Sequence, residues 1–251
     1  MASNQVALVT GGSRGIGAAV VRALTQAGYS VAFSYRERAR EADDACRALQ
    51  AAGHEVRAFA CDMNDRAACD RLVADALAAF GRLDVLVNNA GTHVPMVRFA
   101  DLRDEDWDRV MGANLTAPFR ITRAVLPVMR KQGSGHVINL SSNVALRMPA
   151  GYGVYTVSKV GLEAFTKVLA KEEGPHGIRV NGVGPGPIRT DMLQESFDAL
   201  GAERANAFVK SITLGRMGEP EEIASVVAFL LSDAASYMTG QIVYVNGGGV
   251  G

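Results

Sequence analysis

Short runs of β-branched and apolar residues alternate with longer amphipathic stretches from one end of the chain to the other. The helical stretches include long ones at 104–131 and 153–173. The strand-like runs fall at residues 5–10, 31–35, 55–61, 83–89, 136–142, 178–186 and 241–246. Strands joined by helices pair in parallel and are covered on both faces. The alternation therefore predicts an α/β fold, a doubly wound parallel sheet of about seven strands with helices on both faces.

Nothing in the sequence divides this pattern into separate folding units. A length of 251 residues suits one α/β domain, and no proline- or glycine-rich linker or internal repeat interrupts it. We therefore expect residues 1–251 to form a single domain. The least regular stretch, 187–215, is predicted to be a mobile lid over the site. Its apolar residues could line a pocket or simply pack helices; they are Met192, Leu193, Phe197, Leu200 and Phe208.

The charge balance and the scattered cysteines and histidines argue against several classes of function. Lys plus Arg and Asp plus Glu both number 26, so no net field favours nucleic acid or an anionic membrane. No run of about eighteen apolar residues indicates a membrane span. The first residues lack a basic stretch followed by an apolar one, so we expect a cytoplasmic protein. The three cysteines lack CxxC spacing and the four histidines form no cluster, which predicts reduced thiols and no metal site.

A glycine-rich turn separates the first predicted strand from its helix. It reads Thr10-Gly11-Gly12-Ser13-Arg14-Gly15-Ile16-Gly17. Glycines there let the backbone turn tightly and approach a pyrophosphate, which lies on the positive end of the helix. Because the turn follows the first strand of a βαβ unit, it favours a dinucleotide site. The alternative is a tight turn with a structural role only.

The end of the second predicted strand bears on the choice between NAD and NADP. A carboxylate there would accept hydrogen bonds from the ribose 2′-hydroxyl of NAD. Here the position is Tyr35, followed by Arg36, and the first carboxylate is Glu37. Arg36 and Arg14 could together hold a 2′-phosphate, because guanidinium groups match phosphate geometry. We therefore predict NADP(H) in preference to NAD(H); the alternative is that Arg36 only begins a solvated helix face.

Tyr155 and Lys159 stand four residues apart in a stretch with helical periodicity, which places them on one helix face. A free phenol has a pKa of about 10 and exchanges its proton poorly at neutral pH. A positive charge roughly 4 Å away favours the phenolate by up to about 4 kcal/mol at an effective dielectric near 20. That energy corresponds to about three pKa units, which would suit general acid–base catalysis. Taken alone, such a pair is more often an inert feature of a solvated helix.

Further motifs stand in order along the chain. They are Asp62-Met63, Asn88-Asn89-Ala90-Gly91, Asn114, Ser142, Pro185-Gly186 and the closing TGQIVYVNGG. With the glycine turn and the Tyr155/Lys159 pair, the chain resembles the short-chain dehydrogenase/reductase superfamily along its whole length. It looks most like the 3-oxoacyl-(acyl-carrier-protein) reductase-like members. The resemblance implies a Rossmann-like fold, NADP(H)-dependent exchange between a ketone and a secondary alcohol (EC 1.1.1.-), and a homotetramer.

The resemblance also implies roles for individual residues. Tyr155 would be the acid/base, and Lys159 would depress its pKa and hold the nicotinamide ribose. Ser142 would orient and polarise the carbonyl, whereas strand alternation sends the neighbouring Ser141 to the opposite face. Asn114 would hold a water that links Lys159 to solvent, unless it only stabilises a helix kink.

The remaining positions expected by resemblance concern the cofactor and the substrate. Those expected to bind the cofactor, besides Tyr155 and Lys159, are Gly11, Ser13, Arg14, Gly15, Ile16, Gly17, Tyr35, Arg36, Asp62, Met63, Asn89, Ala90, Gly91, Pro185, Gly186, Ile188 and Thr190. Those expected to border the substrate are His93, Val94, Ser142, Met148, Tyr152 and Met192.

The substrate stays open at this stage. A 3-oxoacyl thioester on an acyl-carrier protein is the leading hypothesis, and it requires a basic rim for an acidic partner. Candidates for that rim are Arg130, Lys131, His136, Lys167 and Lys171, although such charges more often form a solvated surface. A small carbonyl, sugar or steroid-like substrate is the alternative. A non-catalytic cofactor-binding regulator is a more remote one, since such proteins typically lose the tyrosine or the lysine.

Overall fold

Seven parallel strands form one sheet in the order β3-β2-β1-β4-β5-β6-β7. The computed structural model describes residues 5–249. The strands are β1 (Val6–Val9), β2 (Ser30–Tyr35), β3 (Val56–Ala60), β4 (Val85–Asn88), β5 (Gly135–Leu140), β6 (Ile178–Pro185) and β7 (Ile242–Val245). The doubly wound parallel sheet that the sequence predicts is confirmed.

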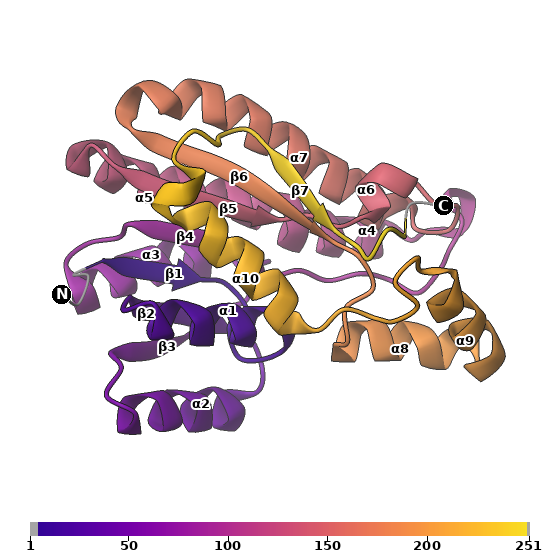
Figure 1. Cartoon of the computed structure of the whole chain (residues 1–251). Coiled ribbons are helices and arrows are strands. Elements are labelled where there is room, and N and C mark those ends of the chain that lie inside the picture. The colour runs from indigo at the N-terminus through magenta and orange to yellow at the C-terminus, as the bar shows by residue number, and fades with distance from the viewer. Residues whose placement is uncertain (1–4, 250–251) are drawn as a thin grey trace.

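Helices cover both faces of the sheet (Figure 1). The α-helices are α1 (Gly15–Gln26), α2 (Ala39–Ala51), α3 (Arg66–Phe80), α4 (Asp104–Met111), α5 (Ala117–Gln132), α6 (Val144–Arg147), α7 (Gly153–Glu173), α8 (Asp191–Leu200), α9 (Ala202–Ser211) and α10 (Pro220–Leu231). Short 3₁₀ turns lie at Phe99–Asp101, Gly174–His176 and Asp233–Ala235. Among the helices of residues 5–249, none has both the length and the apolar character that crossing a bilayer requires.

The two faces of the sheet bury separate hydrophobic clusters. Along β1, Leu8 joins the cluster under α3, α5 and α7, whereas Ala7 and Val9 join the cluster under α1, α2 and α10. Successive side chains of a strand point to opposite faces, so a strand covered on both sides is mostly apolar along its whole length. This requirement explains the uninterrupted apolar runs from which the strands can be predicted.

The strand order places a crevice at one edge of the sheet. β1 pairs with β2 on one side and with β4 on the other. The connections therefore leave β1 and β4 in opposite directions, and ligands of such sheets bind outside the carboxyl ends of the strands at this point. The glycine turn between β1 and α1 lies at that edge.

The helix expected over 104–131 is interrupted. α4 ends at Met111, a π-helical turn spans Gly112–Thr116, and α5 follows. Pro118, near the start of α5, has no N–H group and cannot donate the helical hydrogen bond to the carbonyl of Asn114. A local wide turn accommodates this missing bond, and such turns are frequent at functional sites. Asn114 lies in the middle of it.

The stretch expected to be irregular, 187–215, contains two short helices. α8 begins after Thr190, whose hydroxyl accepts a hydrogen bond from the N–H of Leu193, and α9 follows directly. Figure 1 shows both helices beyond the carboxyl end of β6, outside the layers that cover the sheet. We call this pair of helices the α8–α9 segment.

Candidate active site

A cleft of about 760 Å³ opens at the carboxyl edge of the sheet. Its walls come from the glycine turn, from the loops that follow β2 to β6, from α7 and from the α8–α9 segment. Every residue that the sequence predicts to bind the cofactor lines this cleft. The topology brings these residues together because the carboxyl ends of parallel strands share one edge.

The glycine turn forms a cradle that only glycine can build. Gly11 has φ +67°, and a Cβ there would lie 3.1 Å from the Cα of Ala90. A Cβ on Gly17 would lie 2.0 Å from the carbonyl oxygen of Gly11. α1 begins at Gly15 with no side chain capping it and no acidic residue in its first turn. Its N–H groups therefore face the cleft in a form suited to an anion such as a pyrophosphate.

Asn89 and Thr10 hold this cradle against the end of β4. The Asn89 amide donates to the carbonyls of Thr10 and Gly11, at 2.8 and 3.0 Å. The Thr10 hydroxyl accepts from the N–H groups of Asn89 and Ala90, both at 3.0 Å. The Asn89 side chain, expected along the cofactor ribose, thus also fixes the path of the turn.

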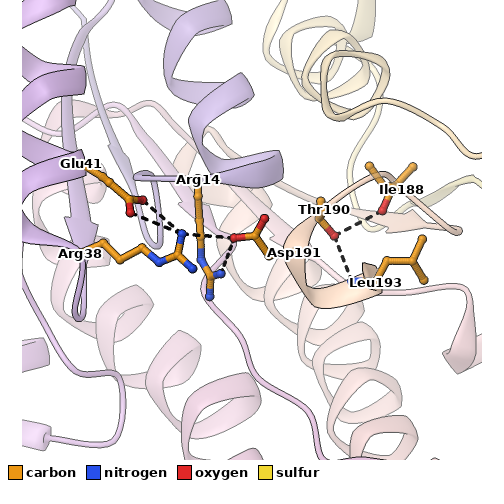
Figure 2. A network of polar contacts seen from close by, with 7 residues as sticks. All are labelled: Arg14, Arg38, Glu41, Ile188, Thr190, Asp191 and Leu193. Atoms are coloured by element: carbon orange, nitrogen blue, oxygen red, sulfur yellow. Dashed lines mark hydrogen bonds and ion pairs between the residues drawn. The ribbon is translucent and has the colours of Figure 1, made fainter. Parts of the chain in front are cut away.

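At the far end of the cleft, the arginines are arranged differently from the expectation. The guanidinium of Arg36 pairs with its neighbour Glu37 at 2.7 Å. Arg14 and Arg38 instead converge on Asp191, the first residue of α8 (Figure 2). Arg38 and Asp191 line the cleft and were missed by the sequence reasoning. The available signal is the run RERAR, in which spacing alone does not say which arginine reaches Asp191.

Tyr155 and Lys159 come together one turn apart on α7. The Nζ atom of Lys159 lies 5.7 Å from the centre of the Tyr155 ring and donates to the carbonyl of Leu140 at 2.7 Å. Lys159 is only 4% exposed. The lysine therefore ties the middle of α7 to the end of β5, with its charge beside the phenol.

Burial dominates the acid–base properties of this pair. Burial raises the pKa of Tyr155, and a hydrogen bond with Ser142 lowers it by a smaller amount. Burial lowers the pKa of Lys159 to about 8. The expected depression of the Tyr155 pKa is thus wrong for this structure, because withdrawal from water outweighs the favourable contacts. The phenol is protonated at neutral pH, and the lysine is still mostly charged.

The two serines at the end of β5 have different partners. The Ser141 hydroxyl donates to the Glu163 carboxylate at 2.7 Å, and the Tyr244 hydroxyl donates to the same carboxylate at 2.8 Å. Ser142 instead bonds Tyr155, and its hydroxyl accepts from the N–H of Val144 at 3.3 Å. The hydroxyl beside the phenol is therefore that of Ser142, the serine that the family spacing selects.

Asn114 lies behind the cleft wall and is fully buried. Its amide donates to the Thr92 carbonyl at 2.9 Å and to the Ser158 hydroxyl at 3.0 Å, and its oxygen accepts from the Thr92 N–H at 2.8 Å. The side chain thus joins the loop after β4 to α7. A Cβ on Gly91 would lie 3.0 Å from the Asn114 oxygen and 3.7 Å from the Lys159 nitrogen, so Gly91 stands between them.

Near Tyr155 the cleft is bordered by side chains from α8 and α9. Met192, Leu193, Phe197 and Phe208 line it, with the two phenyl rings edge to face at 5.8 Å between centroids. The side chain of Leu200, considered with them, lies outside the described residues. These apolar residues give the cleft a hydrophobic wall at this end.

Of the residues expected to border the substrate, some line the cleft and others do not. His93, Tyr152, Ser142 and Met192 line the cleft. The His93 ring stands edge-on to Tyr155 with 6.4 Å between centroids, and burial lowers the pKa of His93.

Two of the residues expected to border the substrate require correction. Val94 is buried in a small cluster with Val110 and Val154, and Met148 is 63% exposed, so neither lines the cleft.

The fold, the glycine cradle and the position of the cleft are those of Rossmann-type dinucleotide-binding proteins. Residues 11–249 match the family described as Enoyl-(Acyl carrier protein) reductase. A 3-oxoacyl-[acyl-carrier-protein] reductase of Synechocystis sp. is 41% identical, covering 97% of this chain and 96% of that protein. The chain therefore belongs to the short-chain dehydrogenase/reductase family of oxidoreductases.

Solved structures agree with this assignment. A short-chain dehydrogenase/reductase from Serratia marcescens superposes with a TM-score of 0.91 at 38% identity, covering 98% of both chains. A blue fluorescent protein from a metagenomic library, solved in complex with NADPH, superposes with a TM-score of 0.90 at 37% identity, again over 98% of both chains.

Proposed function

We propose that the protein is an NADP(H)-dependent oxidoreductase that interconverts a ketone and a secondary alcohol. The observation that carries this proposal is the convergence of Tyr155, Ser142 and Lys159 at one end of a cleft whose other end is the glycine cradle. The nicotinamide, when bound, supplies or accepts the hydride. No additional redox group is then required for the reaction.

The proton that the carbonyl oxygen needs comes from residues of the protein. Tyr155, protonated at neutral pH, is suited to donate its proton to a carbonyl oxygen as that oxygen becomes an alcohol. Ser142, already bonded to the phenol, orients the same oxygen. The charge of Lys159 stabilises the phenolate that remains after the transfer, because the two groups lie close together away from water. Asn114 acts further back, by holding α7 against the loop after β4.

Two features support NADP(H) over NAD(H). Arg14 and Arg38 both face the cleft where the second strand ends, and the region lacks a carboxylate at Tyr35, where an NAD-binding protein would carry one. A relative of the same fold was solved with NADPH. Guanidinium pairs bind phosphate well, which is the group that distinguishes the two cofactors.

For the substrate, we propose a carbonyl compound with an apolar portion, with a 3-oxoacyl thioester as the first candidate. The apolar wall of Met192, Phe197 and Phe208 supports an acyl chain, and the Synechocystis relative is a 3-oxoacyl-[acyl-carrier-protein] reductase. A small carbonyl, sugar or steroid-like compound is the second candidate.

One observation favours a small substrate over one delivered by a carrier protein. Arg130 and Lys131 end α5 and precede β5, so they lie at the amino edge of the sheet, opposite the cleft. Arg130 is also paired with the buried Glu173, at 2.8 Å. His136, the second residue of β5, lies at the same amino edge. These residues therefore do not form a basic rim beside the cleft.

Assembly into a homotetramer remains a prediction. Phe119 on α5 and Val157 and Val168 on α7 are 43%, 40% and 54% exposed, as residues of a subunit interface would be in an isolated chain. Light scattering on the purified protein measures the assembly directly.

The test of the proposed function is a substrate panel with the wild type and with Tyr155→Phe. Ketones and 3-oxoacyl thioesters are mixed with NADPH or NADH, and consumption of the reduced cofactor is followed by absorbance. We expect turnover with NADPH in the wild type and a loss of about 10²–10⁴-fold in Tyr155→Phe, with NADPH binding retained. Unchanged turnover in Tyr155→Phe would contradict the role of the phenol, and equal rates with NADH would contradict the cofactor preference.

A further inference from the structure

One carboxylate oxygen of Asp191 pairs with two guanidinium groups at the far end of the cleft. The Nη1 atom of Arg14 lies 2.8 Å from Oδ2 of Asp191, and the Nη1 atom of Arg38 lies 3.3 Å from the same oxygen (Figure 2). Arg14 belongs to the glycine turn, Arg38 ends the loop between β2 and α2, and Asp191 is the first residue of α8. Three segments that are far apart in sequence therefore meet at one charge.

The positive and negative charges around Asp191 cancel. Arg38 also pairs with Glu41 on its other side, at 3.3 Å. Two guanidinium groups are thus balanced by two carboxylates. A ribose 2′-phosphate carries roughly −1.5 to −2 charges, as other phosphomonoesters do. Such a group would be attracted by Arg14 and Arg38 and repelled by Asp191 and Glu41, so it cannot gain the full attraction of the arginines while Asp191 stays in place.

The helix itself does not explain why Asp191 contacts both arginines. A carboxylate in the first turn of a helix is already stabilised by the helix dipole. The N-terminus of α8 is also capped by Thr190, whose hydroxyl accepts from the N–H of Leu193 and donates to the carbonyl of Ile188. Arg36, by contrast, pairs with its sequence neighbour Glu37. Asp191 links α8 to the glycine turn through Arg14 and to the loop after β2 through Arg38.

An anionic ligand can readily replace Asp191 in its ion pairs with Arg14 and Arg38. The side chains of Arg14, Arg38 and Asp191 are 49%, 46% and 52% exposed. Ion pairs at this exposure contribute little to stability and are screened by salt, so an incoming anion can replace one partner. All three residues line the cleft, where a ligand can reach them.

We propose that Asp191 is a cofactor-specificity residue that occupies the place of the 2′-phosphate between Arg14 and Arg38. The carboxylate and the phosphate compete for the same two guanidinium groups. Asp191 therefore weakens binding of ligands that carry a 2′-phosphate and leaves binding of ligands without it unchanged. Displacement of Asp191 also frees the start of α8, so the α8–α9 segment responds to the identity of the cofactor. This inference rests on the proposed use of NADP(H).

The test compares Asp191→Asn with a matched variant on the same helix. Asp198→Asn makes the same chemical change at an exposed residue of α8 whose carboxylate accepts from Gln194. Binding of adenosine 2′,5′-bisphosphate and of 5′-AMP is measured by calorimetry at low salt, so that the nicotinamide plays no part. We expect Asp191→Asn to bind the bisphosphate about fivefold more tightly than the wild type, the size of one exposed charge contact, with 5′-AMP unchanged. Asp198→Asn should behave as the wild type with both ligands.

A second measurement follows the α8–α9 segment by hydrogen exchange. In the wild type, the bisphosphate should increase exchange at the start of α8, whereas 5′-AMP should not. In Asp191→Asn, exchange there should already be raised without ligand and should not increase further. The gain in affinity should also shrink in high salt, because exposed charges are screened.

The outcomes separate this inference from the proposed cofactor preference. If the wild type prefers the bisphosphate and Asp191→Asn does not increase that preference, the role of Asp191 is overturned and NADP(H) use stands. If the wild type shows no preference and Asp191→Asn acquires one, NADP(H) use fails and the role of Asp191 stands. If neither protein distinguishes the two ligands, or if Asp198→Asn changes affinity as much as Asp191→Asn, the inference fails.

Discussion

The two ends of the cleft are built differently. At the glycine cradle, the proposed nucleotide end, the wall is closely packed backbone. At the proposed substrate end, the wall consists of side chains on the two short helices α8 and α9. Gly17 has no room for a single carbon, because a Cβ there would lie 2.0 Å from a carbonyl oxygen. At the other end, Met192 is 36% exposed, and Phe197 and Phe208 touch each other across the α8–α9 segment. The backbone wall leaves room for one ligand shape, whereas substitution of side chains can change the shape of the second wall. A fold built in this way keeps its cofactor chemistry and changes its substrate.

Lys159 lies beside Tyr155, and its replacement should have the largest effect. Lys159→Met removes the buried charge beside Tyr155 and the bond to the Leu140 carbonyl. We expect turnover to fall by about 10²–10⁴-fold, because the phenolate formed at Tyr155 loses the charge that stabilises it. The measurement is the initial rate of NADPH oxidation with any ketone the wild type accepts. A variant as active as the wild type would remove Lys159 from the mechanism.

The same lysine should determine the pH dependence of reduction. Its pKa is lowered to about 8, so the ammonium is present below that pH and is lost as the pH rises through it. Reduction by the wild type should therefore decline above about pH 8. The residual rate of Lys159→Met should show no such step. A wild-type profile that is flat to pH 10 would contradict the assignment.

The rigid end of the cleft is tested by Gly17→Ala, which should have the next largest effect. The added carbon forces the turn away from Gly11, which we expect to destabilise the fold by about 2 kcal/mol and to weaken NADPH binding about 10- to 100-fold. Gly174→Ala is the control for added volume, because it adds the same atom where no atom of residues 5–249 beyond the neighbouring residues of the chain lies within 4 Å and φ is −51°. Any loss of stability in this control comes from the following Pro175, which disfavours helical dihedral angles for a residue with a Cβ. Urea unfolding and NADPH titration compare the two. A Gly17→Ala variant as stable as the wild type would show that the turn is more adaptable than its contacts indicate.

The adaptable end is tested by Phe208→Ala. Loss of this ring opens the apolar wall, so KM for an acyl substrate should rise about tenfold, while NADPH affinity and the unfolding midpoint stay close to the wild type. Phe229→Ala removes a ring that is 45% exposed on α10, away from the cleft, and should change neither constant. An equal loss of NADPH binding in Phe208→Ala would break the distinction between the two ends.

The smallest effect is expected from His93→Gln. His93 stands against Tyr155, and its Nε2 atom lies 3.4 Å from the Ser196 hydroxyl on α8. Burial lowers the pKa of His93, so the ring is already neutral at pH 7. We expect kcat/KM to fall about threefold by loss of contact area, with the same pH profile between 6 and 8 as the wild type. A profile that changes shape in this range would show that His93 carries a proton during turnover.

The parts of the fold that could be predicted from sequence are those set by local patterns. The strands are mostly apolar because both faces of the sheet are covered, so their number and parallel pairing follow from the alternation of strand-like and helical stretches. The π-helical turn at Gly112–Thr116 was not separable from a long helix, because it preserves much of the helical periodicity. The interpretation of Asn114 as a residue that stabilises an irregular point in a helix agrees with its place in this turn.

The parts of the site that could not be predicted depend on contacts over long distances in the sequence. Arg14 and Asp191 are 177 residues apart, and their meeting depends on the path of the loop after β6. Val94 and Met148 follow strands whose carboxyl ends border the cleft, yet their loops place one in a separate small core and the other at the surface. The pKa of Tyr155 was expected to be lowered because its partner was known and its burial was not.

The carboxylate of Glu163 accepts hydrogen bonds from two hydroxyls, that of Ser141, which directly follows β5, and that of Tyr244 on β7. Glu163 lies one turn beyond Lys159 on the helix that carries Tyr155. The edge strand β7 is therefore tied through a single side chain to the helix that carries Tyr155, and fraying of β7 would take from Glu163 one of its two hydroxyl partners.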